Sequence, residues 1–439
     1  MASYIPMSAE ERRAMLDVIG VGSPAELFAA IPPRIKLPAL ALPPGQSELE
    51  TCLLMAGLAA KNRRFPLIFR GAGAYWHYIP AIVGSVINKE EFVTAYTPYQ
   101  AEISQGILQA IFEFQTMIAD LTGLDVANAS VYDGASAAAE AVNMCRDRRR
   151  NKALIAATAP PMVIETIRTY CFGNNSGLEL IPCGPDGLTD VAALAALLND
   201  GISCVYVQQL NFSGLIEDAA TLCQLAHDAG AKFILGVNPI AAAILPSAGE
   251  IGADIAVGEG QPLGLPLSFG GPYLGLMATG AEMMRKLPGR IVGQTTDLEG
   301  RRAFVLTLQA REQHIRREKA GSNICSNQNL CALAASVYLA AMGNEGLITA
   351  AQNCYAHAHY LAERLAELGF VRLHSAEFFH EFVTDSPMPP ERLLAGLEER
   401  GILGGLALAE GGILWCATEM TGKAEIDALV KAIREVSGQ

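Results

Sequence analysis

Positive charge is scarce in this sequence: 32 lysines and arginines stand against 45 aspartates and glutamates, a formal net charge of −13 at pH 7. A uniformly acidic surface repels nucleic acid and anionic membranes, so neither is an expected partner. The sequence has no run of about 18 uncharged apolar residues, the minimum for a membrane-spanning helix. The N-terminal segment MASYIPMSAEERRAM becomes charged where a secretory signal would be apolar. These absences predict a cytoplasmic protein.

Signatures of disulfide frameworks and metal centres are also missing. Ten cysteines are scattered through the chain without a Cys-x-x-Cys pair or a histidine at ligand spacing. This scatter predicts reduced, mostly buried thiols. Of the seven histidines, His357 and His359 lie two positions apart on a predicted helix and point in different directions, and the other five are isolated. The sequence therefore predicts no metal site.

The glycines near the N-terminus do not form a dinucleotide-binding fingerprint. The segment GVGSPA (residues 20–25) has no strand before it, and the next acid after Glu26 is Glu48, which lies beyond a proline-rich stretch. The fingerprint requires a preceding strand and an acid about 20 residues on. Helix start signals at Ser8 and at Ser23-Pro24 instead predict a helical N-terminal extension over residues 1–65.

From residue 101 onward, helical and β-like segments alternate. Residues 101–122 have the pattern of a long amphipathic helix. Such alternation predicts a large α/β domain at residues 66–325, with a mainly parallel sheet, right-handed crossovers and helices on both faces. The β-like runs are residues 129–132, 153–157, 178–181, 204–208, 233–237, 255–257 and 273–277, and helical segments between them include 135–150, 191–198 and 219–229.

The pattern changes after Asn327. Two long helices reaching Leu368 are followed by the stretch VRLHSAEFFHEFVTD, a helix near residues 391–400, a strand at 413–417 and a last helix. This order predicts a small α+β domain at residues 326–439 with a mostly antiparallel sheet. The whole layout resembles that of the aspartate-aminotransferase superfamily, the fold type I of pyridoxal-phosphate (PLP) dependent transferases.

The lysine that such a fold needs is not where it is expected. A PLP site requires a lysine for the Schiff base, an acid facing the pyridine nitrogen and a helix N-terminus for the phosphate. The segment GADIAVGEGQPLGLPLSFGGPYLG (residues 252–275) has the expected strand and loop but no lysine. Each lysine of the chain is better interpreted as a solvated surface amine. The nine are Lys36, Lys61, Lys89, Lys152, Lys232, Lys286, Lys319, Lys423 and Lys431.

The acid that would face the pyridine nitrogen is missing as well. It is expected at the end of the strand that reads FILGVNPIAA, where Gly236, Val237 and Asn238 offer no carboxylate. The segment DGASAAAEA (Asp133–Ala141) has the turn-to-helix pattern of a phosphate cradle, although other helix starts share that pattern. The basic run RDRRRNK (Arg146–Lys152) is interpreted as the solvated end of a helix, where it complements the helix dipole.

Four long motifs give the sequence a specific resemblance. They are YTPYQAEISQGILQAIFEFQTMIADLTGLDVANASVYDGASAAAEA (Tyr96–Ala141), VQQLNFSGLIED (Val207–Asp218), GEGQPLGLPLSFGGPYLG (Gly258–Gly275) and REKAGSNICSNQNL (Arg317–Leu330). Together they resemble the P-protein family of the glycine cleavage system, and more closely the first of the two chains into which many bacteria divide that protein. The similarity runs from the N-terminal helices into the C-terminal domain.

The resemblance implies a division of labour between two chains. In that family a second chain carries a His-Lys pair in the loop that here reads Gln261-Pro262. The assembled enzyme binds glycine through PLP, releases carbon dioxide and passes the aminomethyl group to the lipoyl arm of H-protein. By this resemblance the present chain holds no cofactor, is inactive alone and completes an active site of its partner, in an assembly expected to be α2β2.

Two polar segments are candidates for reaching that partner site. The stretch TAYTPYQAE places Tyr96, Tyr99, Gln100 and Glu102 just before the helix at residues 101–122. A capping and packing turn is the alternative interpretation. In GSNICSN, residues 321–327, the side chains of Ser322, Asn323 and Ser326 provide loop hydrogen-bonding groups, and packing is an equally good interpretation.

Two other functions remain open at this point. One is a self-sufficient PLP-dependent lyase or transferase with an unconventional lysine, for which Lys319 and Lys286 are the candidates. The other is a structural or regulatory pseudoenzyme that binds a different partner. A neighbouring gene for a similar chain with a His-Lys pair in the strand-end loop would favour the two-chain interpretation.

Overall fold

The computed structural model describes residues 7–37 and 41–438, and the chain divides into two compact units, Met1–Arg64 and Phe65–Gln439. In the first unit, no described residue is buried. The serine start signals are confirmed in part, because Ser8 caps its helix with a capping box whereas Ser23 makes no side-chain cap. The unit contains α1 (Ala9–Ile19), α2 (Glu48–Ala59) and two 3₁₀ helices (Pro24–Phe28 and Pro33–Ile35).

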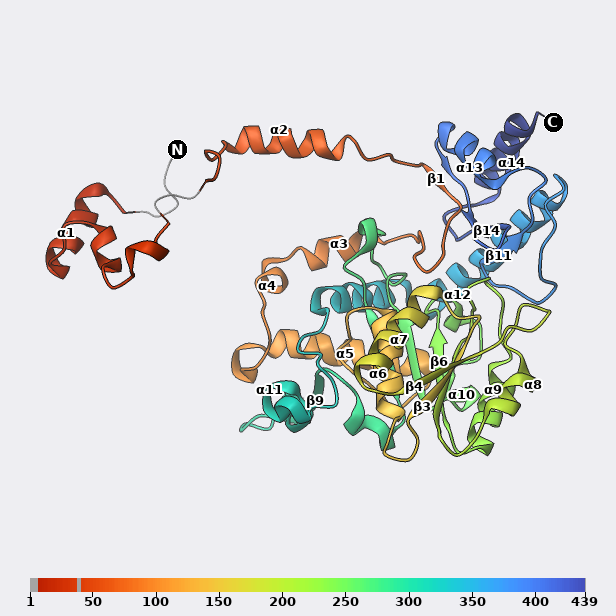
Figure 1. Cartoon of the computed structure of the whole chain (residues 1–439), viewed down its shortest axis with the longest axis horizontal. Helices are drawn as coiled ribbons and strands as arrows, with labels where there is room; N and C mark the ends of the chain where they lie inside the picture. The colour runs from red at the N-terminus through yellow and green to blue at the C-terminus, as the bar shows by residue number, and fades with distance from the viewer. Residues whose placement is uncertain (1–6, 38–40, 439) are drawn as a thin grey trace. The chain divides into compact units, whose positions relative to one another are not determined.

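A seven-stranded sheet forms the centre of the second unit (Figure 1), in the order β2-β8-β7-β6-β5-β3-β4. Neighbouring strands from β7 to β4 are parallel, as predicted, whereas β8 runs antiparallel to both β7 and β2. The strands are β2 (Val126–Ala127), β3 (Lys152–Ala156), β4 (Gly177–Ile181), β5 (Ile202–Gln208), β6 (Lys232–Val237), β7 (Ile255–Glu259) and β8 (Gly275–Thr279).

Alternate residues of these strands pack against helices on the two faces of the sheet. In β5, Cys204 and Tyr206 belong to the core shared with α6 and α7, whereas Val205 and Val207 belong to the core shared with α8 and α9. This pattern is the predicted sheet covered on both sides. Seven of the ten cysteines are buried, which confirms the prediction of mostly buried thiols. The helices are α5 (Gln105–Thr122), α6 (Gly134–Cys145), α7 (Pro161–Gly173), α8 (Val191–Leu197), α9 (Ala219–Asp228) and α10 (Ala248–Ile251).

Several predicted elements are wrong in extent or type. Residues 129–132 form no strand, although Val131 makes one bridge to Gly275. The helix predicted to start at residue 101 begins as a 3₁₀ turn (Ala101–Ile103) before α5. The helix predicted over 135–150 ends at Cys145, where Arg146 takes an extended conformation, so most of the basic run lies beyond the helix. The segment after β8 forms a 3₁₀ helix (Ala281–Lys286).

Sequence analysis did not predict the hairpin formed by β9 (Ile291–Thr296) and β10 (Arg302–Thr307), which pair antiparallel. The hairpin packs against α5 through Val292, Phe304 and Leu306. The shorter helical elements of this unit are α3 (Ala81–Ile87), α4 (Glu90–Val93), α11 (Gln313–Arg316) and 3₁₀ turns at Ala241–Ala243, Ser268–Gly270, Gln309–Arg311 and Arg317–Lys319.

The C-terminal part has the predicted mixture of helices and antiparallel strands. Its sheet has the order β11-β14-β13, and β12 pairs in parallel with β1 (Leu67–Ile68), which lies at the start of the unit. The two helices predicted after Asn327 form one element, α12, with a break at Gly343, whose φ is +59°. The elements are α12 (Asn329–Ala366), β11 (Glu381–Thr384), α13 (Pro390–Glu399), β12 (Ile402–Leu403), β13 (Leu406–Ala407), β14 (Ile413–Cys416) and α14 (Lys423–Ser437).

In the described part of the chain, α12 is the single helix that meets the length and composition criteria for crossing a membrane, with a mean hydropathy of 1.3. It packs as a core helix, because its first half contributes Ala334 and Tyr338 to one hydrophobic core and its second half contributes Leu361 and Leu365 to another. The predicted cytoplasmic location stays a prediction.

Candidate functional site

A cavity of about 530 Å³ lies at one edge of the central sheet. Its wall includes residues at the carboxyl ends of the parallel strands, among them Gln208 of β5, Gly236 of β6 and Glu259 of β7, and residues at the start of α6. Ligands of open α/β sheets bind at this edge, outside the carboxyl ends of the strands. The cavity is therefore the candidate site.

The N-terminus of α6 is already capped by carboxylates of the chain itself. Asp133 Oδ1 accepts a hydrogen bond from Ser136 N at 2.7 Å, and Glu259 Oε2 accepts one from Gly134 N at 2.9 Å. The helix start predicted within Asp133–Ala141 is thus confirmed at Gly134. However, the backbone donors that would hold a phosphate are partly engaged, and two acidic groups lie where its negative charge would be placed.

Glu259 also organises the loop that follows β7. Its Oε1 accepts hydrogen bonds from Gln261 N at 2.9 Å and Leu274 N at 3.0 Å. Burial raises the pKa of Glu259 to about 7, against the lowering effect of the three backbone donors. One buried carboxyl group therefore joins the start of α6, the loop and the start of β8.

The loop position that would carry the lysine is occupied by a structural amide. The side chain of Gln261 is buried, its Oε1 accepts a hydrogen bond from Tyr75 N at 2.9 Å, and its Nε2 donates to Tyr75 O at 2.9 Å and Leu265 O at 2.8 Å. Pro262 lines the cavity, whereas none of the nine lysines does. Lys286 instead donates to Met144 O at 3.0 Å, outside the cavity.

The end of β6 offers no acid to the cavity. A Cβ atom at Gly236 would lie 2.6 Å from the hydroxyl oxygen of Tyr206, so a side chain at this position requires Tyr206 to move. The side chain of Asn238 bonds to the backbone that follows it, since its Oδ1 accepts hydrogen bonds from Ile240 N and Ala241 N. The phenol of Tyr206 donates to Gln208 Oε1 at 2.9 Å. Neutral polar groups therefore occupy this part of the wall.

A buried glutamate of the C-terminal sheet holds the opposite wall, residues 72–75. Glu381 of β11 accepts hydrogen bonds from Ala72 N at 2.6 Å and from the hydroxyl of Tyr75 at 2.7 Å. Burial raises the pKa of Glu381 to about 7. The C-terminal sheet thus fixes the cavity wall through a group whose protonation changes near neutral pH.

Glu381→Gln is expected to flatten the pH dependence of stability. The pKa of Glu381 is about 7 in the folded protein and 4.5 without the fold, so between these values the native state binds more protons than the unfolded state. The native state therefore loses stability as pH rises through this interval, by up to about 1.4 kcal/mol per pH unit for one group. Urea unfolding at several pH values across this interval measures the slope. Glu391→Gln, at an exposed position, is the control, and a Glu381→Gln slope equal to the parent's would contradict the assignment.

The residues predicted to serve a partner site do not line this cavity. Tyr96 is 89% exposed, and Tyr99 is half exposed. The side chains of Gln100 and Glu102 are also exposed, at the 3₁₀ turn before α5. The structure therefore presents these four residues on the surface of the chain.

A buried arginine that sequence analysis missed connects this turn to the GSNICSN segment. Arg290 is 2% exposed; its Nη2 donates to the hydroxyl oxygen of Tyr99 at 3.3 Å, and its Nη1 donates to Ser326 Oγ at 3.4 Å and Asn327 Oδ1 at 3.3 Å. Its guanidinium also lies 5.4 Å from the centre of the Tyr99 ring. A lone arginine before an apolar strand gives no sequence signal for this role, because its partners are distant in the sequence.

The other two candidates of the GSNICSN segment differ from each other. Ser322 donates to Glu140 Oε1 at 2.8 Å and accepts a hydrogen bond from Ile324 N, whereas Asn323 is exposed. Burial raises the pKa of Glu140 to about 7. Ser322 is therefore tied to α6 in the chain, and Asn323 is accessible at the surface.

A second polar cluster gathers His77, Cys354 and Glu419, whose ligand-type atoms all lie within 4.8 Å of one another. His77 Nδ1 lies 2.8 Å from Glu419 Oε2, and the Cys354 thiol donates to the same oxygen at 3.2 Å. Burial raises the pKa of Cys354 well above its usual value, so the thiol keeps its proton. Hydrogen bonds account for the cluster, and the absence of a metal centre stays a prediction.

Comparison with known proteins gives consistent results over the whole chain. The model of the family described as glycine cleavage system P-protein matches residues 2–433. A curated protein of Thermomicrobium roseum, the probable glycine dehydrogenase (decarboxylating) subunit 1, is 47% identical over 445 residues, with 99% of each chain covered.

Solved structures show the same relationship. The crystal structure of a glycine decarboxylase (P-protein) of the glycine cleavage system, in inhibitor-bound form, is 41% identical and has a TM-score of 0.94, with 99% of this chain and 100% of that chain covered. A cysteine desulfurase of Escherichia coli is 15% identical and has a TM-score of 0.64 over 87% of this chain and 98% of its own, which shows the fold alone. The predicted PLP-dependent transferase fold type I is confirmed.

Proposed function

Because the chain belongs to the P-protein family of the glycine cleavage system, we propose that it is the subunit of glycine dehydrogenase (decarboxylating) that lacks the Schiff-base lysine. In this proposal it completes an active site whose lysine belongs to a second, similar chain. The observation that carries the proposal is the lysine-free cavity at the carboxyl edge of the sheet, where Gln261 is locked by three hydrogen bonds of its side chain.

The residues of this cavity do not fit PLP. No lysine lines it, the end of β6 has no carboxylate to pair with a pyridine nitrogen, and the carboxyl groups of Asp133 and Glu259 engage the start of α6. A phosphate placed at that helix would be repelled by Asp133 and by the ionised form of Glu259, whose pKa is about 7. These features support the proposal that PLP is bound by the partner chain alone.

In the assembled enzyme, the substrate is glycine and the acceptor is the lipoyl arm of H-protein, which receives the aminomethyl group after carbon dioxide is released. This assignment follows the family, and the fold supports it by retaining the architecture of a PLP enzyme in a chain that lacks its reactive lysine. The chain would then contribute surface residues and an interface instead of a nucleophile.

We infer that the Tyr96–Glu102 turn and the GSNICSN segment supply those surface residues. Arg290 binds Tyr99 from the first and Ser326 from the second, so two segments about 220 residues apart in sequence are held as one surface. Tyr96 and Asn323 are exposed on these segments, which leaves them accessible to a partner. A surface held by a buried guanidinium can present polar groups with little loss of conformational freedom.

The two alternative functions receive less support. Lys286 and Lys319, the candidates for a self-sufficient enzyme, line a different pocket from the cavity described above. A regulatory pseudoenzyme is favoured by one observation, the retained cavity of about 530 Å³. Family membership over nearly the full chain favours the two-chain enzyme over both.

The proposal is tested by co-expression with the lysine-bearing chain, followed by size measurement and an assay of glycine-dependent carbon dioxide exchange. We expect a stable hetero-oligomer, because obligate interfaces bury about 2,000 Å² or more of apolar-rich surface. The α2β2 composition is expected from the family resemblance. Exchange activity should appear in the fraction that contains both chains. Independent migration of the two chains at micromolar concentration would defeat the proposal.

A further inference from the structure

A second pocket, of about 330 Å³, opens beside the carboxyl end of α6 and shares no lining residue with the cavity described above. Its wall combines the last turns of α6 with residues 285–289 and the segment from Arg311 to Ile324. The proposed function uses neither its volume nor its charged groups.

The charge of this pocket is opposite to that of the chain. Six cationic side chains line it against two carboxylates, Glu140 and Glu312, in a chain whose net charge is −13. Burial raises the pKa of Glu140 to about 7, so that this carboxyl group is only partly charged at neutral pH. The six cations are Arg146, Arg285, Lys286, Arg311, Arg316 and Lys319.

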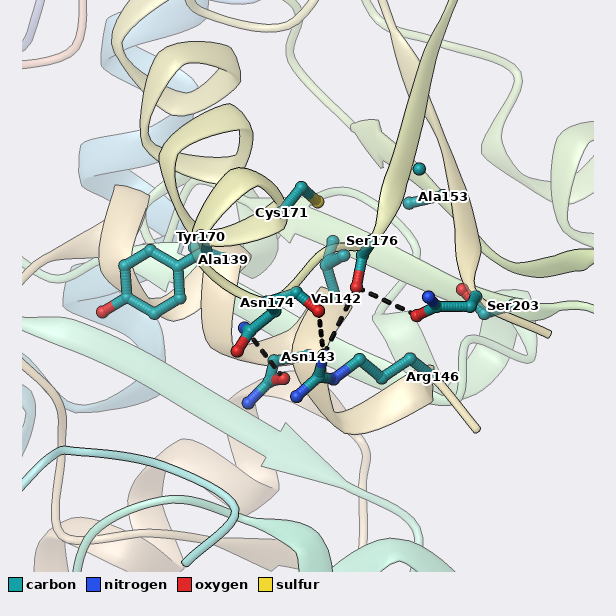
Figure 2. A pocket seen from close by; sticks show the side chains of 12 residues that line it. Ala139, Val142, Asn143, Arg146, Ala153, Tyr170, Cys171, Asn174, Ser176 and Ser203 are labelled. Atoms are coloured by element: carbon teal, nitrogen blue, oxygen red, sulfur yellow. Dashed lines mark hydrogen bonds between the residues drawn. The ribbon is translucent and has the colours of Figure 1, made fainter. Parts of the chain in front are cut away.

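The hydrogen bonds that these cations donate do not go to carboxylates. Arg146 donates to Asn174 O at 3.1 Å and Ser176 Oγ at 3.4 Å. Figure 2 shows this guanidinium in another pocket, which shares Asn143 and Arg146 with the pocket described here. Lys286 donates to Met144 O, and Arg311 Nη1 donates to Leu287 O. All of these acceptors are neutral. Among the residues that the structure describes, none of the six cations forms a salt bridge.

Arg311 contributes the most specific feature. Its Nε and Nη2 atoms are buried and have no hydrogen-bond partner within the described chain. These two nitrogens form one edge of the guanidinium, the edge that binds a carboxylate or phosphate through two parallel hydrogen bonds. The neighbouring Glu312 does not occupy that edge, because its Oε1 is itself without a partner and its Oε2 lies 3.6 Å from His314 Nδ1. Buried donors without a partner call for an acceptor that the chain does not supply.

We propose that this pocket binds a small oxyanion, the phosphate or carboxylate group of a soluble molecule, with the free edge of Arg311 as its anchor. Arg146 and Lys286 are held in place by their backbone and side-chain acceptors, and they supply positive charge at fixed positions. Arg285, Arg316 and Lys319 complete the positive wall. All of its lining residues belong to this chain, and its charged groups have no part in the proposed function, so the inference goes beyond that function and does not depend on it.

The test measures binding of radiolabelled inorganic phosphate to the full-length chain by equilibrium dialysis, at constant ionic strength in sodium chloride. Radiolabelled malonate, dialysed in the same way, is the second probe, and the tighter of the two ligands distinguishes a phosphate site from a carboxylate site. We expect one phosphate or one malonate per chain with a Kd on the order of 1 mM or tighter. Failure of both probes to bind would overturn the proposal.

Substitutions locate the site. Arg311→Gln should weaken binding about tenfold or more, and Arg311→Lys, which keeps the charge but loses the two-nitrogen edge, should have an intermediate effect. Arg316→Gln should weaken binding about threefold through charge alone. Arg316 is exposed and without a partner, so this variant decides the question if Arg311→Gln does not fold.

The matched control is Arg168→Gln, which removes one exposed positive charge of α7 that pairs with Glu165 and lies outside the pocket. It should bind phosphate like the parent. Equal binding by the parent, Arg311→Gln and Arg316→Gln would place the anion elsewhere and overturn the proposal, as would equal losses in all three variants, Arg168→Gln included. Because the assay needs no partner chain and no glycine, its outcome is separate from that of the proposed function.

Discussion

The chain purified alone and mixed with PLP is expected to show no Schiff-base absorbance band and no glycine-dependent exchange of carbon dioxide. No lysine lines the cavity, and Gln261 at the loop position is engaged in three hydrogen bonds. The nucleophile and the electron sink of this chemistry both depend on a bound cofactor. Exchange should therefore be on the order of 10³-fold or more below that of the two-chain assembly. Visible absorbance and an isotope-exchange assay measure the two quantities.

Borohydride treatment provides the control for this expectation. A stoichiometric adduct on one lysine would refute the two-chain proposal and favour a self-sufficient enzyme, with Lys286 and Lys319 as the first residues to map. The variant Pro262→Lys should also remain inactive, although Pro262 lines the cavity. A new amine does not supply an acid at Gly236–Asn238, nor does it remove the carboxylates at the start of α6.

Tyr96→Phe, Tyr99→Phe and Glu102→Gln are expected to lower turnover of the assembled enzyme while the chains still assemble. These changes remove a hydrogen bond or a charge but little volume. A positioned donor or acceptor can contribute on the order of 10²-fold in rate. Tyr96 is the cleanest probe because it is 89% exposed, whereas Tyr99 also accepts a hydrogen bond from Arg290. Steady-state rates and size measurement of the same preparations check the result.

Tyr355→Phe is the matched control for the tyrosine variants, since it removes a phenol that donates to Glu377 in the C-terminal part. It should assemble and turn over glycine at the parental rate. If Tyr96→Phe, Tyr99→Phe and Glu102→Gln all keep that rate, the turn serves only in packing. If they fail to assemble, the turn belongs to the interface, and no part in the reaction can be assigned to it.

The fold was largely predictable because its main elements depend on local patterns. Short apolar runs separated by helical segments identified the strands from β3 to β7 within a few residues, since a parallel sheet buries both faces of each strand. The errors lie where pairing is distant in sequence. Residues 129–131 are buried beside β8 without forming a strand, and the β9–β10 hairpin was missed although its second strand contains the apolar run at residues 303–306.

The absence of a Schiff-base lysine and of an acid for the pyridine nitrogen was also predictable, because the sequence of a loop shows directly whether it contains such a residue. The hydrogen bonds made by the side chains that hold the cavity wall were not predictable. Glu259 bonds to the start of α6, Gln261 to Tyr75 and Glu381 to Ala72, across sequence separations of 125, 186 and 309 residues. Such contacts depend on how the elements pack, and no local pattern encodes them. Arg290 was missed for the same reason, because it binds Tyr99, which precedes it in the sequence, and Ser326, which follows it.

The pairing of β1 with β12 has a consequence for synthesis on the ribosome. Phe69 follows β1 and is buried in the same core as Trp415 and Ile426, and its backbone bonds to Leu403 O and Cys416 N. This hydrophobic core therefore needs residues from both ends of the second unit. In a nascent chain, the apolar segment around Phe69 has no packing or hydrogen-bond partners until residue 416 has left the exit tunnel. Contacts of such long range also form slowly. Chaperone binding during translation should therefore concentrate on this early segment.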